Sequence, residues 1–478
     1  MGATHTEPDA VRLGTPAGRG LLGAAVLGSG MAFLDSTVVN VAVRAIGKDL
    51  DASLGALQWT ITGYTLTLAA LILVSGTLGD RFGRRRLFVI GVTWFAVASL
   101  ACALVPNVEL LVIARLLQGV GGALLTPGSL AMLQASFAKD DRAKAIGLWS
   151  GLSGVAVAAG PFVGGWLIEL SWRWIFAINL PLAVVTVALA LRCAPESRDP
   201  NPEPMDVPGA ALGILALGAG TYALIAAGGG SSPAMLATTA VLAVGAGAGF
   251  VVRQLRSRHP SVPPELFTNR VFNVVNLETL FVYAALSGVA FFLVLQLQTS
   301  LGYSPLQAGI ATLPMTALLT AFSGWAGAFG ARVGPRLPLT AGPLLAAAGL
   351  LLLVGVSAGD DYWTAVLPGV LLFGVGLTVL VAPLTATVMA AAPHHLVGTG
   401  SGVNNAVART GGLLAVAALP AVAGLSGHAY EDPVALTSGY RVAMWVCVAL
   451  LAVGAGVAAV ALPGRQLVQD TSPQEEQR

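Results

Sequence analysis

Residues 20–43 read GLLGAAVLGSGMAFLDSTVVNVAV, and this run decides the class of fold because it is long and apolar enough to cross a bilayer. A membrane-spanning helix needs about 20 mostly apolar residues, at a rise of about 1.5 Å each. Asp35 would then lie inside the membrane, near the far end of this helix. A carboxylate there costs about 3 kcal/mol on insertion scales, so we expect it to face a cavity or a partner and to have a function.

The composition of the whole chain is that of a polytopic membrane protein. Its 478 residues are 55% hydrophobic and only 10% charged, with a mean hydropathy of +0.79, whereas charged residues make up about a quarter of a soluble domain. The formal charge of +2 does not favour nucleic acid as a partner. The three cysteines are odd in number and widely spaced, and the five histidines show no ligand spacing. We therefore expect an all-α membrane protein without a metal or cofactor.

Apolar runs separated by short polar loops predict fourteen spans. We place them at residues 20–43, 57–78, 87–105, 109–135, 145–168, 174–193, 207–228, 234–253, 271–298, 305–329, 337–357, 363–390, 398–425 and 440–462. The first run is longer than the apolar core of a signal peptide and lacks a clear cleavage site, so we expect it to be retained. An even number of spans places both termini on one side of the membrane.

The basic residues predict which side that is. Nineteen of them lie in the loops that share a side with the termini, and only four, Arg44, Lys48, Arg173 and Arg441, lie in the other loops. Cytoplasmic loops carry the excess of lysine and arginine in membrane proteins. We therefore expect a multi-pass protein of the cell membrane with both termini in the cytoplasm.

Two longer cytoplasmic stretches, 194–206 and 254–270, have the proline-rich and charged composition of linkers and isolate the seventh and eighth spans. The predicted division is an N-terminal segment 1–19, a six-helix bundle 20–193, a linker 194–206, a two-helix insert 207–253, a linker 254–270, a second six-helix bundle 271–462 and a tail 463–478. An internal repeat supports it, because GTLGDRFGRR at 76–85 returns as GAFGARVGPR at 327–336. Paired halves around a site near the midplane are the plan of many secondary transporters.

The loop Gly76–Arg86, GTLGDRFGRRR, resembles the cytoplasmic loop signature of the major facilitator superfamily. Further stretches resemble its fourteen-span drug:proton antiporter branch, the EmrB/QacA type: LDSTVVNVA at 34–42, RLLQG at 115–119, GVAVAAGPFVGG at 154–165 and WRWIFAINLP at 172–181. The resemblance implies a major facilitator fold, with two six-helix bundles plus a two-helix insert and fourteen transmembrane helices. It also implies proton-coupled antiport, and the stretch 154–165 accompanies export rather than uptake.

Two of these stretches are candidates for controlling conformational change. In the loop, glycines allow a tight turn and Asp80 can pair with Arg81 or Arg84, although the positive charge alone would also anchor the topology. In the fifth span, small residues let helices approach and Pro161 kinks the helix, although ordinary tight packing would use them equally. The resemblance implies that the loop latches the two halves in one state. The candidate residues are Gly76, Gly79, Asp80, Arg81, Gly83, Arg84, Gly154, Gly160, Pro161, Gly164 and Gly165.

Away from span ends, the apolar runs contain four ionisable residues: Asp35, Arg115, Glu278 and Arg409. Asp35 and Arg115 lie at about the same depth, counted at about 1.5 Å per residue from the outer ends of their spans, so they can pair. An arginine favours the ionised form of a carboxyl and burial disfavours it, so cargo or a proton can shift the balance, although a static structural pair is the alternative. The resemblance makes Asp35 the proton-titrating residue and Arg115 its switchable partner.

The sequence allows three interpretations of Glu278: a second protonation site, a counter-ion for cationic cargo, or a structural partner of Arg409. Polar and aromatic residues of the spans are candidates for lining the cargo cavity, although buried amides often only link helices and aromatic residues often only pack. These candidates are Phe33, Gln58, Tyr64, Gln118, Asn276, Tyr283, Gln296, Asn404, Asn405 and Arg409.

The energy source follows from what the sequence lacks and contains. None of the three lysines lies in a GxxxxGK[ST] phosphate loop, so an ion gradient must drive transport. Buried acids favour protons as the coupling ion, and sodium is the alternative. We expect a monomeric proton-coupled antiporter that exports lipophilic or cationic small molecules, such as drugs, dyes or antibiotics, by alternating access. The alternatives are an importer or facilitator on the same fold and a membrane-embedded enzyme, for which His394 and His395 are the only candidate cluster.

Overall fold

The computed structural model describes residues 11–200 and 204–464, and these residues fold almost entirely into helices. Residues 1–10, 201–203 and 465–478 lie outside the described residues, and they belong to the predicted N-terminal segment 1–19, linker 194–206 and tail 463–478, with Arg465 and Arg478 in the tail. The first half of the chain forms α1 (Pro16–Leu50), α2 (Leu54–Phe82), α3 (Arg84–Leu104), α4 (Val108–Ser136), α5 (Lys139–Leu170), α6 (Trp174–Ala177) and α7 (Asn179–Cys193). The insert forms α8 (Val207–Gly228) and α9 (Pro233–Arg256). The second half forms η1 (Pro264–Thr268), α10 (Arg270–Thr299), α11 (Pro305–Val333), α12 (Arg336–Leu353), η2 (Tyr362–Val366), α13 (Leu367–Ala391), η3 (His394–Leu396), α14 (Val397–Val422) and α15 (Pro433–Ala461).

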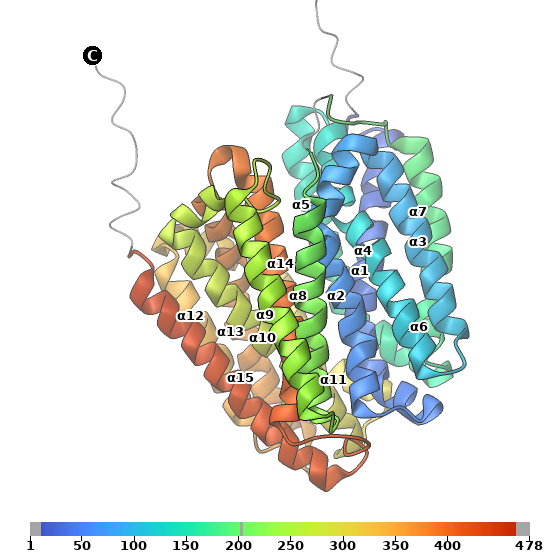
Figure 1. Ribbon diagram of the computed structural model, residues 1–478, viewed down its shortest axis with the longest axis vertical. Coiled ribbons are helices and arrows are strands. Elements are labelled where there is room, and N and C mark those ends of the chain that lie inside the picture. The colour runs from blue at the N-terminus through green and yellow to red at the C-terminus, as the bar shows by residue number, and fades with distance from the viewer. Residues whose placement is uncertain (1–10, 201–203, 465–478) are drawn as a thin grey trace, which may run out of the picture.

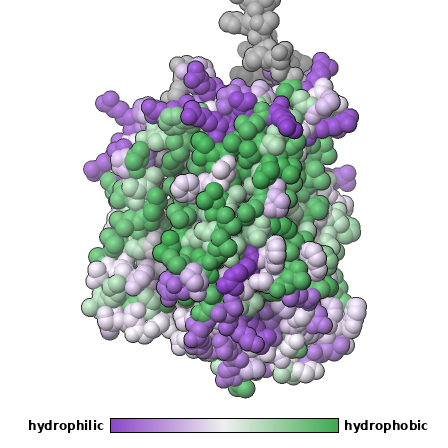
Figure 2. Space-filling model, turned by 90° about the vertical axis from the view of Figure 1, so that its right-hand side faces the viewer, coloured by the Kyte–Doolittle hydropathy of each residue, from purple (hydrophilic) through white to green (hydrophobic). Residues whose placement is uncertain are grey.

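The helices are long and apolar enough for a polytopic membrane protein. Thirteen helical segments of the described chain could cross a membrane, and α2, which is bent near residue 73, makes a fourteenth when it counts as one span. Figure 2 shows an apolar belt between two polar ends, as a bilayer requires. The prediction of an all-α membrane fold with fourteen spans is confirmed.

Several helices extend beyond their predicted spans. α1 continues to Leu50, where Asp51 takes a left-handed conformation, and α15 begins at Pro433 behind the capping side chain of Asp432. Hydropathy marks only the part of a helix in hydrocarbon, whereas capping residues decide where the helix stops. The predicted end of the first span at 43 is therefore too early and the predicted start of the last span at 440 too late, because these helices continue past the apolar belt.

The helices form two bundles with the insert across their junction (Figure 1). α8 packs against α2 of the first half and α14 of the second, and α9 packs on α8. α1 begins and α15 ends at the same end of the molecule, the top of Figure 1. This packing supports the six–two–six division, which we keep as a proposal.

One buried carboxylate joins the two insert helices. The Asp206 side chain accepts hydrogen bonds from the Gly209 amide at 3.1 Å, from Arg253 Nε at 3.0 Å and from Gln254 Nε2 at 2.8 Å. Burial acts to raise the pKa of the Asp206 carboxyl, but the hydrogen bonds from Arg253 and Gln254 outweigh it, so the pKa is lowered. Asp206 therefore caps α8 and also fastens α9 to it.

The variant Asp206→Ala is expected to lose about 1–2 kcal/mol of stability at neutral pH, because a helix cap and an ion pair disappear together. A carboxylate with a lowered pKa stabilises the fold above its unfolded pKa of about 4, and this contribution is lost as the pH falls through the folded pKa. The difference in thermal unfolding between wild type and variant, in detergent, should therefore shrink below about pH 4. Asp432→Ala, which removes the cap of α15, is the control. A difference that stays constant down to acid pH would contradict the ion pair.

The two halves are closed against each other at the end where α1 stops. There, Arg44 Nη1 donates to the Gln298 carbonyl at 2.8 Å, Gln298 Nε2 donates to the Val41 carbonyl at 2.9 Å, and the Tyr430 hydroxyl donates to the Ala52 carbonyl at 2.9 Å. Hydrogen bonds that join a described residue of one half directly to a described residue of the other lie in this part of the molecule. The structure is therefore a conformer closed at this end.

Candidate functional site

Asp35 and Arg115 form an ion pair in the centre of the first bundle. Asp35 comes from α1 and Arg115 from α4, and Arg115 Nη1 lies 2.5 Å from Asp35 Oδ2. Both side chains are only 1% exposed. Arg115 Nε also donates to the Thr60 carbonyl of α2 at 2.9 Å. The pairing suggested by their equal depth is present, and it ties three helices together.

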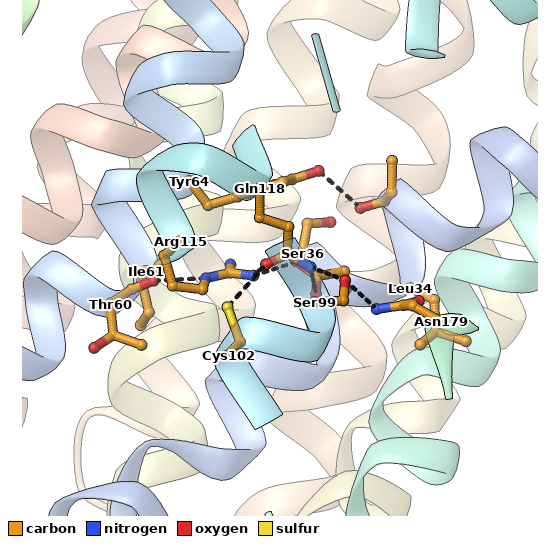
Figure 3. A network of polar contacts seen from close by, with 12 residues as sticks. Leu34, Ser36, Thr60, Ile61, Tyr64, Ser99, Cys102, Arg115, Gln118 and Asn179 are labelled. Atoms are coloured by element: carbon orange, nitrogen blue, oxygen red, sulfur yellow. Dashed lines mark hydrogen bonds and ion pairs between the residues drawn. The ribbon is translucent and has the colours of Figure 1, made fainter. Parts of the chain in front are cut away.

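Gln118, one turn after Arg115, completes the shell around the carboxylate. Its Nε2 donates to Asp35 Oδ1 at 2.9 Å and to Ser99 Oγ at 2.8 Å, and its Oε1 accepts from Arg115 Nη1 at 2.5 Å. Asn179 of α7 extends the network by donating to Ser99 Oγ at 3.3 Å (Figure 3). Both oxygens of Asp35 are therefore hydrogen-bonded, which a buried carboxylate needs to remain ionised.

Two aromatic rings lie against the Arg115 guanidinium. Its Cζ is 4.5 Å from the ring centre of Tyr64 and 5.6 Å from that of Phe176. Tyr64 is itself buried, and its hydroxyl donates to the Ala32 carbonyl at 3.3 Å. Such cation–π contacts are worth about 2 kcal/mol when desolvated. Tyr64 and Gln118, which were candidates for the cargo cavity, instead enclose the ion pair in this conformer.

Glu278 and Arg409 do not meet. Glu278 is completely buried on α10, close to where Gly454 of α15 approaches, and neither carboxylate oxygen has a hydrogen-bond partner among the described residues. Arg409 lies at the middle of α14 and its Nε donates to Asn405 Oδ1 at 2.8 Å. Its helix packs against α2 of the first half, which places Arg409 on the helix that borders the junction of the halves. The interpretation of Glu278 as the structural partner of Arg409 is therefore wrong, because α10 turns the carboxylate toward α15.

Other amides of the cavity list link helices instead. Gln58 Nε2 of α2 donates to the carbonyls of Val416 and Ala417 of α14, at 2.7 and 2.9 Å. Gln296 Nε2 donates to the Val356 carbonyl at 2.9 Å, and Asn404 Nδ2 to Asn276 Oδ1 at 3.1 Å. The half-buried or exposed members of the list are Phe33, Tyr283, Asn404, Asn405 and Arg409.

The glycine-rich loop is tied to the linker that follows the first bundle. Asp80 Oδ1 lies 2.8 Å from Arg84 Nη2, so its partner is Arg84 rather than Arg81. Gly83 has a φ of +104°, which favours glycine at this turn. The Glu196 carboxylate accepts from the backbone amides of Arg85 and Arg86 at 3.1 and 3.2 Å, and so caps α3. A Cβ at Gly76 would meet nothing within 4 Å, and one at Gly79 would lie in ordinary contact with Leu87, 3.6 Å away.

The glycines of the fifth span bring α5 against α1 and α11. A Cβ at Gly160 would collide with Thr37, and one at Gly164 would lie 2.7 Å from Val38 Cγ1. A Cβ at Gly165 would lie 2.6 Å from the Leu306 Cα of the other half, and the Pro161 carbonyl lies against Gly309 of α11. A Cβ at Gly154, by contrast, meets nothing within 4 Å. Residues 160–165 are therefore a close backbone contact at the closed end.

The variant Gly165→Ala is expected to open this contact. Overpacking costs about 1–3 kcal/mol, so the closed population should fall about fivefold or more. Disulfide cross-linking between Glu169→Cys and Ser304→Cys, whose native side chains are hydrogen-bonded at 3.1 Å, reports the closed state. Gly154→Ala is the matched control and should cross-link like the parent. Equal cross-linking in both variants would show that the Gly165 contact does not hold the halves together.

Sequence reasoning missed some members of the site. Ser99, Cys102 and Thr60 surround Arg115 and Gln118, but hydroxyl and thiol groups are common in spans and carry no signal of their own. Asn179 belongs to the stretch WRWIFAINLP at 172–181, and an amide close to Pro181 was the one sequence feature that pointed to a polar contact here. Glu196 was counted as part of a linker.

The comparisons with known proteins agree with the fold. The family model of the Major Facilitator Superfamily matches residues 25–416. The tetracenomycin C resistance and export protein of Streptomyces glaucescens is 35% identical, covering 97% of this chain and 88% of that protein. The methylenomycin A resistance protein of Streptomyces coelicolor is 38% identical, with coverage of 82% and 83%, and the puromycin resistance protein pur8 of Streptomyces alboniger is 34% identical, with coverage of 91% and 90%.

Solved structures show the same fold at low sequence identity. A bacterial homologue of the human lysosomal transporter Spinster, in an inward-facing and unoccupied conformation, has a TM-score of 0.67 at 19% identity and covers 96% of this chain and 99% of its own. The D-xylose-proton symporter has a TM-score of 0.66 at 15% identity, with coverage of 93% and 98%. With its family match over most of its length and close relatives along nearly the whole chain, this protein belongs to the Major Facilitator Superfamily of membrane transporters.

Proposed function

We propose that this protein is a proton-coupled antiporter that exports lipophilic small molecules from the cytoplasm. The observation that carries the proposal is the enclosed Asp35–Arg115–Gln118 network, an ionisable group inside the membrane with a partner that can release it. Export is supported by relatives named for antibiotic resistance and, in one case, for export. The transporter family leaves no place for the alternative of a membrane-embedded enzyme.

Asp35 couples the proton to the conformational change in this proposal. In the described conformer, Arg115 and Gln118 each donate to one oxygen of the Asp35 carboxylate, and hydrogen bonds and a positive charge at these oxygens favour its ionised form. When the molecule opens at the other end, Asp35 takes a proton at Oδ2 and the attraction to Arg115 is lost. On return, Arg115 reforms the ion pair, which favours the carboxylate form and drives the proton off. One such cycle moves a proton inward as cargo moves outward.

Orientation follows from the distribution of basic residues. We place both termini in the cytoplasm, which makes the closed end, where α1 stops, the extracellular end. The described conformer is then inward-facing.

The charges of the second bundle narrow the class of cargo. Arg409 lies at the middle of α14, half-buried, with one hydrogen bond and no ion pair to a described carboxylate. A cation at that depth is expensive and usually serves a function. Glu278, the acid that would suit a cationic cargo, is turned toward α15. We therefore favour lipophilic cargo with a neutral or anionic acceptor group over the cationic cargo first expected. A second protonation site at Glu278 is the alternative that the variant Glu278→Gln tests.

The proposal is tested in everted membrane vesicles that contain the protein and have an acidic interior. Neutral, anionic and cationic lipophilic fluorescent dyes are added outside. We expect the neutral or anionic dye to accumulate, the lumen to become less acidic as dye enters, and both effects to stop when the proton gradient is collapsed. Dye accumulation that is driven by a sodium gradient instead would contradict proton coupling. Dye movement in the opposite direction only would contradict export and favour the importer alternative. Vesicles without the protein are the control.

A further inference from the structure

The two insert helices border a space that neither bundle would contain alone. A cavity of about 610 Å³ lies between α8, α9, α2, α10 and α14. Its walls are almost entirely apolar: Ala69 of α2, Gly213 and Ala216 of α8, Phe250 of α9, Leu280 of α10 and Val407 of α14. We call this space the insert chamber. Its volume is in the range of about 300–1,000 Å³ that is typical of sites for small molecules.

The insert chamber exists because α8 packs unevenly along its length. Toward its C-terminal end α8 lies close to both halves, since a Cβ at Gly228 would be 3.3 Å from Ala421 of α14, and Ile225 lies 3.5 Å from the Cβ position of Gly55 of α2. Toward its N-terminal end the helix presents small residues, and the cavity separates it from α2 and α14. Small side chains thus occur where space is left, so the hollow is encoded in the α8 sequence.

The insert and the linker that follows it line the chamber on the side toward lipid and toward the cytoplasmic end. α9 presents apolar side chains outward, with Val241 72% and Val244 73% exposed. At the end of α9, Gln254 Oε1 accepts from the Val262 amide at 3.0 Å, and Val262 lines the chamber. The hydrogen bond from Gln254 Nε2 to the Asp206 carboxylate holds Gln254 in this position. The insert and linker therefore form a wall whose other side faces the two moving halves.

The chamber adjoins the residues proposed to meet cargo. Leu280 and Thr410 line it, and they lie within one turn of Tyr283 and next to Arg409 respectively. An occupant would touch α2 of the first half and α10 and α14 of the second, so it would contact both moving parts. A lipid chain held only to fill space would not require this position between the halves.

We propose that α8 and α9 form the outer wall of a binding chamber whose occupant is the lipophilic molecule that the protein exports. This inference rests on the proposed function, and it gives the two-helix insert the role of holding cargo between the halves before transport. Its apolar lining binds by removing apolar surface from water, and this favours lipophilic molecules without selecting one structure.

The test fills the chamber and compares it with a matched change outside. Ala216→Phe places a ring in the chamber, whereas Ala211→Phe makes the same substitution on the exposed side of the same helix. We expect Ala216→Phe to raise the dye concentration for half-maximal export, and the dissociation constant of the purified protein in detergent, by about tenfold or more, and Ala211→Phe to change neither by more than about twofold. Thermal unfolding shows that both variants are folded.

Each outcome decides the matter. Equal dye binding and export by the two folded variants would overturn the inference, as would loss of a co-purified lipid from Ala216→Phe with unchanged dye affinity, which would make a lipid chain the occupant. If Ala216→Phe does not fold, Ala216→Cys replaces it in a Cys193→Ala background: dye should slow its reaction with a lipophilic maleimide, and should not protect Ala211→Cys. Equal reaction with and without dye would refute the chamber. Failure of wild type to export any dye would instead refute the proposed function.

Discussion

Asp35→Asn is expected to reduce proton-driven export to the level of vesicles without the protein, while the protein still folds and still exchanges cargo for cargo. Asparagine has nearly the same shape, and its amide oxygen can still accept from Arg115, while its amide nitrogen takes the place of the oxygen that accepts from Gln118. It cannot ionise, so the return to the described conformer no longer releases a proton. Exchange of labelled for unlabelled dye needs no net proton movement and should persist, which separates lost coupling from lost folding.

The matched control for this variant is Glu278→Gln, which removes the other buried acid in the same kind of environment. Because Glu278 faces α15 and has no described hydrogen-bond partner, we expect proton-driven export to continue in this variant. If Glu278→Gln also stops export while exchange persists, Glu278 is a second protonation site. Full proton-driven export by Asp35→Asn would remove Asp35 from the mechanism.

Arg115→Met is expected to destabilise the protein by about 3–5 kcal/mol, because it leaves the Asp35 carboxylate buried without its cation. The variant also loses the contacts of the guanidinium with the Tyr64 and Phe176 rings and its hydrogen bond to the Thr60 carbonyl. The measurement is thermal unfolding and the yield of monodisperse protein in detergent. Arg115→Lys should recover only part of the loss, since an ammonium cannot reproduce the planar guanidinium contacts.

The double variant Asp35→Asn with Arg115→Met separates the cost of an unpaired charge from the cost of lost packing. Removing both charges should recover most of the stability, because replacing a buried ion pair by neutral groups is often nearly neutral. It should not recover proton-driven export. A double variant as unstable as Arg115→Met alone would show that packing of the guanidinium, and not the ion pair, dominates the stability of this region.

Features that depend only on the position of a residue along a helix could be predicted from the sequence. The spans follow from hydropathy, and the equal depth of Asp35 and Arg115 follows from a fixed rise per residue. The direction of a side chain around the helix axis is different, because neighbouring helices set it. Glu278 and Arg409 illustrate this limit: their depths allowed a pair, but α10 directs Glu278 to α15. Gln58 similarly reaches carbonyls of α14 that no local pattern indicates.

The insert shows a second limit. Its two spans were identified from hydropathy alone, and their sequence gave no purpose for them. The chamber depends on where small residues of α8 meet gaps beside α2 and α14, which only the packing reveals. The roles of Ser99 and Asn179 were hidden for the same reason, since each acts through a residue on another helix.

The claim that Asp35 couples protons to transport is tested most directly by counting protons when cargo binds. Purified protein in weakly buffered detergent solution is mixed with dye, and a pH indicator records released protons over a range of pH. Cargo that favours the described conformer must favour the unprotonated, paired form of Asp35, so wild type should release protons as dye binds. The account predicts that Asp35→Asn binds dye and releases none. Equal proton release by wild type and Asp35→Asn would contradict it.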